Sequence, residues 1–448
     1  MYTPGAWRVH GAAPEPVMLD PLFSSLDSQR ELVVRWQREM TARPALGPEN
    51  NGDGEAAKAE WLLLELGRLG LADIARHDCP DARVPCGYRP NLSARVPGRS
   101  ARTLWVIAHM DVVPPGDERL WSAPPFELRV EGDRVYGRGV EDNQQAIVSA
   151  MLAALALLDS DLTPDLSLGL LFVADEESGM RHGLPHVLEQ CGHLFSPVDL
   201  FLVPDMGNAS GAMVEVAEKS CLGLRITVTG RHNRDDAPGA AVRPDTLDTL
   251  GIRDIRGIRG IRARTAAAAC VLELERLYRL FRAKNPLFGP PWSTFEPSKK
   301  ESGQAAVTVP PGGDGFFLDC RVLPEYDIDE VEAEARAVAG DVAARYGVAV
   351  RVDVLHKEQA PPPTPLTAPV VERLCAALER LRGVSPKVCG VGGQTLASCL
   401  RRKGLDTAVW ATLVPNPHVP DECSSITAAI DDAKILLAML FDEICGDG

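Results

Sequence analysis

The sequence lacks several features that would assign it to well-known classes of protein. No apolar run reaches the roughly 18 residues that a membrane-spanning helix needs. The N-terminus does not combine a basic start with an apolar stretch, so we expect no signal peptide. The eleven cysteines are odd in number and are never spaced as CxxC, which disfavours a disulfide framework and a zinc–thiolate site. Reduced thiols and a cytoplasmic location are therefore expected.

Three catalytic motifs are also missing. The sequence contains no GxSxG turn, no GxxxxGK[ST] loop and no HExxH pair, which leaves serine hydrolases, nucleotide-binding loops and HExxH metalloproteases without support. The formal net charge of −15 disfavours nucleic acid or an anionic membrane as the main partner. The composition, with 45% hydrophobic and 24% charged residues, is ordinary for a globular protein, and 448 residues leave room for two domains.

Short apolar runs that end at acidic residues or histidine indicate a sheet whose functional side chains gather at one edge. Buried strands are predicted at residues 104–108, 166–174, 198–203 and 407–411, and helices at residues 25–40, 55–69 and 143–158. Strands that alternate with helices favour an α/β domain with a mixed, largely parallel sheet. Open sheets of this kind bind ligands at the carboxyl ends of their strands.

The pattern changes after Lys219, where apolar and polar residues alternate as in a sheet with one solvated face. Helices at residues 266–282 and 328–346 and strands at residues 315–323 and 348–355 indicate an inserted α+β domain. The proline-rich residues 359–369 are predicted to form a stiff linker, and the Ile-Arg-Gly near-repeat at residues 250–264 an exposed basic loop. The predicted domains are residues 1–219 with 358–448, which form one discontinuous domain, and residues 220–357, which form the insertion.

His109 and Asp111 lie two residues apart, directly after the first predicted strand. On an extended backbone this spacing points both side chains the same way. A metal-bound histidine commonly donates its second ring N–H to a carboxylate. The pair therefore fits a metal ligand with an orienting carboxylate, although a histidine that ends a strand beside a turn would give the same phrase.

Further phrases place ligand types after a predicted strand or before a predicted helix. Asp142, in GRGVEDN, has two oxygens that could bridge two ions, or it could lie at the cap of the next helix. In ADEESG, one of the adjacent residues Glu176 and Glu177 could be a metal ligand and the other a base. A solvated acidic turn would give the same sequence. Asp205 in VPDMG and His418 in NPHVPDE add one ligand type each. Because all these phrases fall at one edge of the sheet, together they predict a divalent metal site.

Taken together, the phrases resemble the di-zinc metallopeptidase family of acetylornithine deacetylase, succinyl-diaminopimelate desuccinylase, aminoacylase and the glutamate-releasing carboxypeptidases. The resemblance extends over most of the chain, in the order RPNLSARVPG, HMDVVPPG, WSAPPF, GRGVED, DEESG, DCRVLPEYD, VGGQT and PHVPDE. It implies a zinc-peptidase α/β domain with an inserted ferredoxin-like lid. In this family the lid often forms the contact of a homodimer.

The resemblance also implies a role for each polar residue of these phrases. The ligands would be His109 with Asp205 for one ion, Glu177 with His418 for the other, and Asp142 as the bridge. Asp111 would orient His109, and Glu176 would be the general base. Two divalent ions are implied, most often zinc, with cobalt or manganese as further options. They would lower the pKa of a shared water, and Glu176 would transfer its proton to the leaving amine.

Substrate-binding residues follow from the same resemblance. Arg321, in DCR, would bind a substrate carboxylate, with a salt bridge at a strand edge as the alternative. Gly392 and Gly393 would bring backbone N–H groups to the same ligand. Members of the family usually have a lid histidine in a phrase like GxxxHxxxP. Here the phrase TGRHNRDDAPG places Arg234 at that position and His232 two residues earlier, so either residue would have to replace the usual oxyanion donor.

The sequence thus predicts a cytoplasmic, homodimeric hydrolase that cleaves an amide bond in an N-acyl amino acid or a small peptide. Its partner would be a small molecule bearing a carboxylate, with neither nucleic acid nor membrane involved. The alternative is a metal-holding binding protein of the same fold whose catalysis is impaired by the altered lid phrase.

Overall fold

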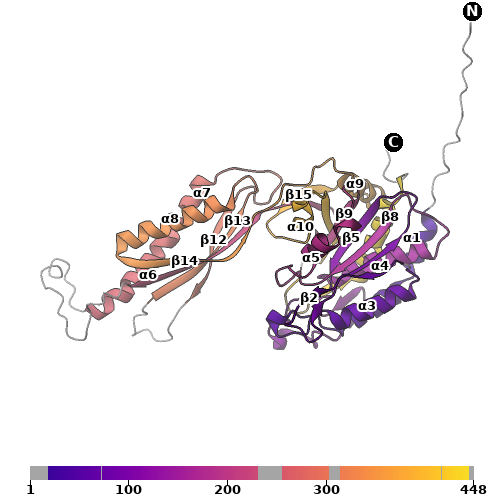
Figure 1. Ribbon diagram of the computed structural model, residues 1–448, viewed down its shortest axis with the longest axis horizontal. Coiled ribbons are helices and arrows are strands. Elements are labelled where there is room, and N and C mark those ends of the chain that lie inside the picture. The colour runs from indigo at the N-terminus through magenta and orange to yellow at the C-terminus, as the bar shows by residue number, and fades with distance from the viewer. Residues whose placement is uncertain (1–18, 72, 231–254, 302–312, 415, 443–448) are drawn as a thin grey trace, which may run out of the picture. The chain divides into compact units, whose positions relative to one another are not determined.

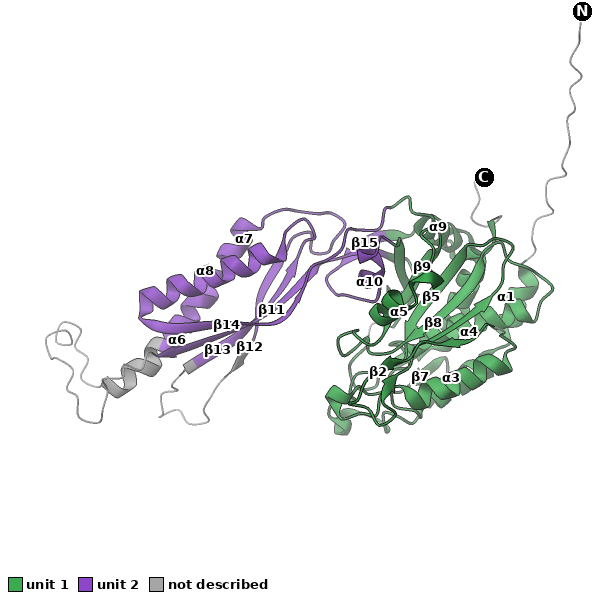
Figure 2. Ribbon diagram, in the orientation of Figure 1, with its two compact units in different colours: residues 1–214, 366–387, 405–448 green, residues 215–365, 388–404 purple. Residues whose placement is uncertain are grey.

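The computed structural model describes residues 19–71, 73–230, 255–301, 313–414 and 416–442 (Figure 1). The chain divides into two compact units (Figure 2). Unit 1 comprises Met1–Val214, Leu366–Lys387 and Leu405–Gly448, and unit 2 comprises Glu215–Pro365 and Val388–Gly404. The assignment of residues 1–219 with 358–448 as a catalytic domain and of 220–357 as a lid stays a prediction.

An eight-stranded sheet has the strand order β1-β4-β8-β5-β9-β16-β10-β15. The strands that pair in parallel are β5 (Thr103–His109), β8 (Ser167–Val173), β9 (Leu200–Asn208) and β16 (Thr407–Thr412). Antiparallel pairs add β4 (Leu92–Val96) and β1 (Ala75–Arg76). Every residue of β5 and β8 is buried, as expected for strands covered on both faces. A unit boundary falls within β10 (Met213–Glu218) and another within β15 (Lys387–Val391).

The central helix of unit 1 is α4 (Gln144–Leu158), which contacts β4, β5 and β8. It is also covered by α1 (Asp20–Asp27), α2 (Arg30–Thr41) and α11 (Ile426–Met439). Because neighbours surround it, most of its residues are apolar and nearly all are buried. Among the described residues, no helix combines the length and the apolar composition that crossing a bilayer requires.

The remaining elements of unit 1 are two further helices and several short helices and strands. α9 (Pro369–Arg382) contacts β9 and β16, and α3 (Ala56–Arg68) contacts β4. The others are η1 (Pro48–Asn50), β2 (Cys79–Pro80), β3 (Tyr88–Arg89), η2 (Glu118–Leu120), β6 (Arg129–Glu131), β7 (Arg134–Tyr136), α5 (Leu184–Gln190), η3 (Gly192–Leu194) and β17 (Cys423–Ser425).

Unit 2 contains a four-stranded antiparallel sheet with the order β12-β13-β11-β14. Along the chain its elements are β11 (Ser220–Gly230), α6 (Ile255–Leu274), α7 (Arg276–Leu280), β12 (Thr294–Glu301), β13 (Gly313–Val322), α8 (Ile328–Tyr346) and β14 (Val348–Glu358), with α10 (Ala397–Arg402) further on. Both α6 and α8 contact this sheet. This β-α-β-β-α-β order is the ferredoxin-like arrangement, and the predicted fold class is confirmed.

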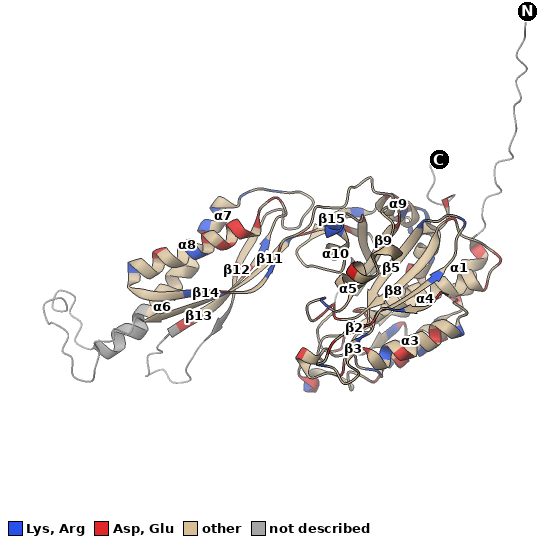
Figure 3. Cartoon of the chain, in the orientation of Figure 1, with Lys and Arg blue, Asp and Glu red and all other residues tan. Residues whose placement is uncertain are grey.

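Charged residues of both signs occur along α3 and α8 (Figure 3). Neither helix therefore presents the uniformly basic face that binding to a phosphate backbone would favour.

Two local predictions were wrong, and one strand was missed. The helix expected at residues 25–40 is two helices, because the hydroxyl and the N–H of Ser28 both donate to the carbonyl of Ser25 and end α1 there. The basic loop expected at residues 250–264 is helical from Ile255 onward, since α6 continues into an alanine-rich segment and packs on β11, β13 and α8. β12 was not predicted. Residues 250–254 lie outside the described residues.

Candidate metal centre

Two of the predicted ligands are positioned by neighbouring parallel strands. His109 is the last residue of β5, and its side chain is almost completely buried. Asp205 lies within β9, which extends further than predicted, to Asn208. The register between β9 and β16 shifts between Val409 and Ala411, so that three residues of β9 lie opposite one residue of β16. Such a bulge re-aims a side chain, and it accounts for an aspartate in mid-strand whose carboxylate reaches His109.

Asp142 lies at the centre of the cluster. Its Oδ1 is 2.9 Å from Nε2 of His109, and its Oδ2 is 2.9 Å from Nε2 of His418. Asp205 approaches His109 at 3.5 Å, and Glu177 approaches His418 at 3.3 Å. Two donor sets therefore share one aspartate, whose two oxygens face different histidines.

The separations between donor atoms fit divalent ions. Zinc binds nitrogen and oxygen ligands at about 2.0–2.2 Å, so two ligands of one tetrahedral ion lie about 3.3–3.6 Å apart. The ligand atoms of His109, Asp142 and Asp205 all lie within 4.8 Å of one another, as do those of Asp142, Glu177 and His418. Small side-chain movements would bring either set to the required spacing.

Asp111 fixes the acidic turn as well as the first histidine. Its carboxylate accepts hydrogen bonds from the backbone N–H groups of Glu176 and Glu177, at 3.0 and 2.9 Å. Its carbonyl oxygen lies 3.1 Å from Nδ1 of His109, and its nearest carboxylate oxygen lies 3.5 Å from the same nitrogen. The predicted orientation of His109 is thus made chiefly by the Asp111 backbone, while the Asp111 carboxylate positions the two glutamates.

Glu176 and Glu177 differ in their contacts. Glu177 meets His418, whereas the Glu176 carboxylate has no hydrogen-bond partner among the described residues. Burial raises the pKa of Glu176 well above its ordinary range, and the neighbouring acids raise it further against the opposing effect of His109. Burial also raises the pKa of Glu177, to about 7. The free carboxylate is suited to proton transfer, and the engaged one is suited to ligation.

The two histidines compensate part of the acidic charge. Burial disfavours the charged form of His109, but its contacts with Asp111, Asp142 and Asp205 outweigh burial and hold its pKa well above the usual value. Hydrogen bonds to Asp142 and Glu177 raise the pKa of His418 to about 10. Bound cations would take the place of these protons, because a ligating imidazole must be neutral.

Two residues beneath the cluster were missed by the sequence reasoning. Asn143 donates through Nδ2 to Pro204 O and to Asp205 Oδ1, both at 2.9 Å, and its Oδ1 accepts from the N–H of His109 at 3.3 Å. Its position directly after Asp142 is the signal in the sequence that could have identified it. Lys58 is buried and donates to Met110 O at 2.7 Å. Nothing in its local sequence marks it.

A second buried network holds the acidic turn from its other side. The Arg89 guanidinium pairs with Glu55 and lies 3.3 Å from Asp175, the residue before Glu176. Asp175 has a left-handed backbone (φ 61°), and its carboxylate contacts Nδ1 of His182 at 2.6 Å. His182 is therefore a structural partner of the turn.

The predicted substrate-binding residues Arg321 and Gly392 meet in unit 2. Arg321 donates through Nη1 to the Gly392 carbonyl at 3.0 Å and through Nε to Asp319 at 3.1 Å. The salt-bridge alternative is thus present, while Nη2 has no partner among the described residues. Gly393 follows in the same turn. His232 and Arg234 lie outside the described residues.

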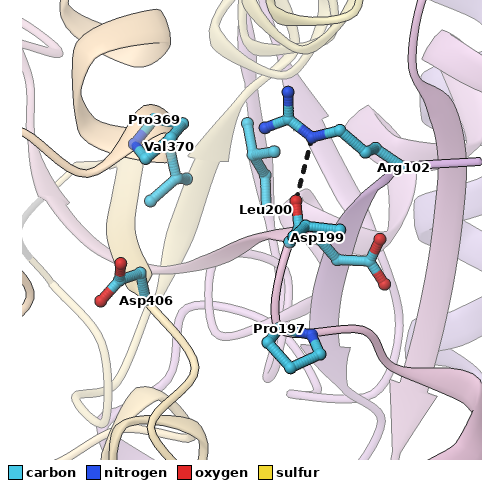
Figure 4. Close-up of a pocket in the computed structure, with 8 residues that line it drawn as sticks. Arg102, Pro197, Asp199, Leu200, Pro369, Val370 and Asp406 are labelled. Carbon is cyan, nitrogen blue, oxygen red and sulfur yellow. Dashed lines mark hydrogen bonds between the residues drawn. The ribbon is translucent and has the colours of Figure 1, made fainter. Parts of the chain in front are cut away.

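A hollow of about 390 Å³ lies at the opposite ends of the same strands. It is lined by Arg102, Asp199 and Asp406, which precede β5, β9 and β16, together with apolar residues of α9 (Figure 4). None of the predicted site residues lines it, and the carboxylate of Asp199 is occupied by the N–H groups of Thr103 and Ser196. This hollow is therefore distinct from the predicted ligand cluster, in which His109 ends β5.

Comparison with known proteins gives concordant results. Residues 105–442 match the model of Peptidase family M20/M25/M40. An uncharacterised metallohydrolase of Methanococcus maripaludis is 31% identical over 427 residues, which cover 91% of this chain and 98% of the relative. Succinyl-diaminopimelate desuccinylase of Paracidovorax citrulli is 29% identical over 48% of this chain and 54% of its own length.

Two solved structures share the fold. Human carnosine dipeptidase 1 superposes with a TM-score of 0.70 at 18% identity, covering 96% of this chain and all of that one. A dinuclear metal-binding M20 peptidase of Bacillus subtilis gives a TM-score of 0.58 at 15% identity, covering 92% of this chain and 98% of its own.

The fold and the ligand cluster define a metal-dependent hydrolase that acts on amide bonds. The chain belongs to Peptidase family M20/M25/M40, which confirms the resemblance drawn from its motifs.

Proposed function

We propose that this protein is a di-metal amidohydrolase that cleaves the amide bond of an N-acyl amino acid or a small peptide. The observation that supports it best is the placement of Asp142, whose two oxygens each lie 2.9 Å from a different histidine. One bridging carboxylate between two imidazoles is the arrangement expected of a two-ion site.

The ligand assignment follows from these contacts. His109 and Asp205 would hold one ion, His418 and Glu177 the other, and Asp142 both. Zinc is the proposed ion, since two imidazoles with carboxylates suit it, and cobalt or manganese would fit the same donors. When bound, such ions would polarise the amide carbonyl and make water acidic near neutral pH.

The chain's own groups would then perform the proton transfers. Glu176, whose carboxylate has no hydrogen-bond partner among the described residues, would accept a proton from the attacking water and return one to the leaving amine. Asp111 would hold Glu176 in place through its backbone N–H, which donates to the Asp111 carboxylate at 3.0 Å. The burial of Glu176 favours this role, because it raises the pKa of the carboxyl well above its ordinary value.

The finer features of the proposal concern substrate and assembly. A substrate carboxylate would be bound by the Arg321 guanidinium and by the N–H groups of Gly392 and Gly393. An oxyanion donor would come from Arg234 or His232. A homodimer formed through the inserted domain and a cytoplasmic location complete the proposal.

Metal stoichiometry and a substrate panel test the proposal together. Purified protein should contain two divalent ions per chain by elemental analysis. With zinc, cobalt or manganese added, it should hydrolyse at least one member of a panel of N-acetyl amino acids, N-succinyl amino acids and dipeptides. A protein without bound metal would refute the proposal. If the protein binds two ions and is stabilised by ligands but turns over no substrate, a metal-holding binding protein is favoured. The altered lid phrase is the reason for considering that alternative.

A further inference from the structure

Glu422 is a buried carboxylate that the proposed reaction does not use. It is completely inaccessible to solvent and follows His418 by four residues on the same segment. The next residue begins β17, which pairs with β7, so the segment after His418 runs beside the segment that leads to Asp142. The backbone adds a hydrogen bond of 3.1 Å from the N–H of Gly137 to the carbonyl of Glu422.

Both oxygens of the Glu422 carboxylate are fully engaged. Oε2 accepts from Arg138 Nη1 at 2.6 Å and from the N–H of Gly139 at 3.1 Å. Oε1 accepts from the N–H groups of Glu141 and Asp142, at 3.0 and 3.2 Å. Four donors that converge from residues 138–142 make this carboxylate the anchor of the whole loop.

The local sequence is adapted to this contact. Gly139 has φ +89°, a left-handed conformation, and an added Cβ would come within 2.5 Å of Val112, so only glycine fits there. Arg138 is buried and neutralises Glu422, and its guanidinium lies 5.1 Å from the centre of the Trp121 ring. A buried carboxylate that accepts charge-assisted and backbone hydrogen bonds holds its partners tightly.

We infer that Glu422 is a positioning residue that fixes the bridging aspartate Asp142 relative to His418. Its chain segment places His418, and its carboxylate holds the backbone N–H of Asp142. One side chain therefore ties together the two loops that supply the bridge and one terminal ligand. This inference rests on the proposed two-ion site, because it assigns Glu422 a task only if Asp142 and His418 bind metal.

The competing explanation is that Glu422 only stabilises the fold. Asp199 provides a matched control within unit 1. It is also a buried carboxylate, and it accepts from the N–H groups of Thr103 at 2.9 Å and Ser196 at 2.8 Å and from Trp105 Nε1 at 3.3 Å. Asp199 directly precedes β9 and lines the hollow at the amino ends of the parallel strands (Figure 4). Loss of either carboxylate charge should affect stability, but only loss of Glu422 should affect the ions.

The experiment compares Glu422→Gln with Asp199→Asn in the full chain. Three properties are measured: the thermal unfolding of the metal-free protein, zinc affinity by competition with a chelating dye, and the visible absorption spectrum of the cobalt-loaded protein. We expect both variants to unfold at lower temperature than the wild type. Glu422→Gln alone should lose about 10- to 100-fold in affinity for at least one ion, the usual effect of removing an outer partner of a metal ligand, and its cobalt bands should shift.

Several outcomes would overturn the inference. One is a Glu422→Gln protein with wild-type zinc affinity and cobalt spectrum, and another is an equal loss of affinity in Asp199→Asn. If Glu422→Gln does not fold, Glu422→Asp replaces it. That variant keeps the carboxylate charge, but its side chain is shorter by one methylene. Wild-type zinc affinity in Glu422→Asp would also overturn the inference. A wild-type protein that binds no zinc would instead refute the proposed function, so the two failures are distinguishable.

Discussion

Two clusters of carboxylates in this molecule, one half-buried and one buried, neutralise their charge in different ways. In unit 1, Asp142, Glu177 and Asp205 contact imidazoles, and no lysine or arginine nitrogen is paired with them among the described residues. In unit 2, Glu215 and Glu218 flank Arg401, which lies 2.9 and 3.9 Å from them. The acids of unit 1 are left for an external cation, whereas those of unit 2 have one from the chain. The presence of a fixed cation thus distinguishes a structural cluster from a candidate metal site.

The largest expected effect comes from the bridging aspartate. Asp142→Asn removes a charge shared by both proposed ions, so the protein should lose at least one equivalent of metal. Its rate should fall by about 1000-fold or more, because an ion contributes several kcal/mol to the transition state. Elemental analysis and hydrolysis of the best panel substrate measure the two losses. Glu218→Gln, in the arginine-neutralised cluster, should leave the metal content unchanged; equal metal loss in both variants would abolish the distinction between the clusters.

The next effect separates the two adjacent glutamates. Glu176→Gln should retain both ions and lose about 100-fold or more in kcat, since it removes the proposed general base but no ligand. Elemental analysis and steady-state kinetics on the same preparation test this. Glu189→Gln is the control, because it makes the same substitution at an exposed position in α5. Its metal content and kcat should match those of the wild type. Near-normal turnover in Glu176→Gln would reject the assignment of the base.

Much of this comparison could be anticipated from the sequence, because its main signals are local. The runs LWVIA and LSLGLLFVA predict buried strands, and a parallel arrangement forces their carboxyl ends to one edge, so the convergence of His109 with the acidic turn was predictable. The motif order identified the family and hence the inserted ferredoxin-like domain.

Other features depend on contacts between segments far apart in the chain. Glu422 meets residues 138–142 across about 280 positions. Asp205 reaches its place through a bulge whose register depends on a strand 200 residues later. Arg401 neutralises Glu215 at a separation of 186 residues. No periodicity or short motif encodes such pairings, because each is decided by tertiary packing rather than by neighbours in sequence.

A smaller effect should change sign with the metal. In the metal-free protein at pH 8, Glu177→Gln removes one charge from a crowded acidic cluster, so the free energy of unfolding should rise by on the order of 1 kcal/mol. In the zinc-loaded protein the same change removes a ligand and should lower the unfolding temperature. Urea unfolding with chelator and thermal unfolding with zinc measure the two cases. Destabilisation in both would mean that Glu177 is a structural residue like Glu215.

The smallest expected effect concerns pH and the cluster of unit 2. Two buried carboxylates share one arginine, and among the described residues one oxygen of each accepts no hydrogen bond. Burial, helped by repulsion from Glu218 and opposed by Arg401, raises the pKa of Glu215 to about 8, and burial raises that of Glu218 to about 7. The folded state therefore binds a proton more tightly than the unfolded chain, where the ordinary value is 4.5. The free energy of unfolding should be highest at low pH and should fall, by on the order of 1 kcal/mol, as the pH rises from about 5 to 8.

The variant Glu218→Gln tests this prediction. Its side-chain oxygen can still accept from Thr395, which donates to Glu218 at 2.7 and 2.9 Å, but the repulsion between the two carboxylates is removed. Urea unfolding of metal-free protein across this range should show a shallower slope in the variant than in the wild type. If the free energy of unfolding falls equally steeply with pH in the variant and the wild type, Arg401 alone neutralises both carboxylates. The sharing of one arginine by two acids would then not distinguish the two clusters.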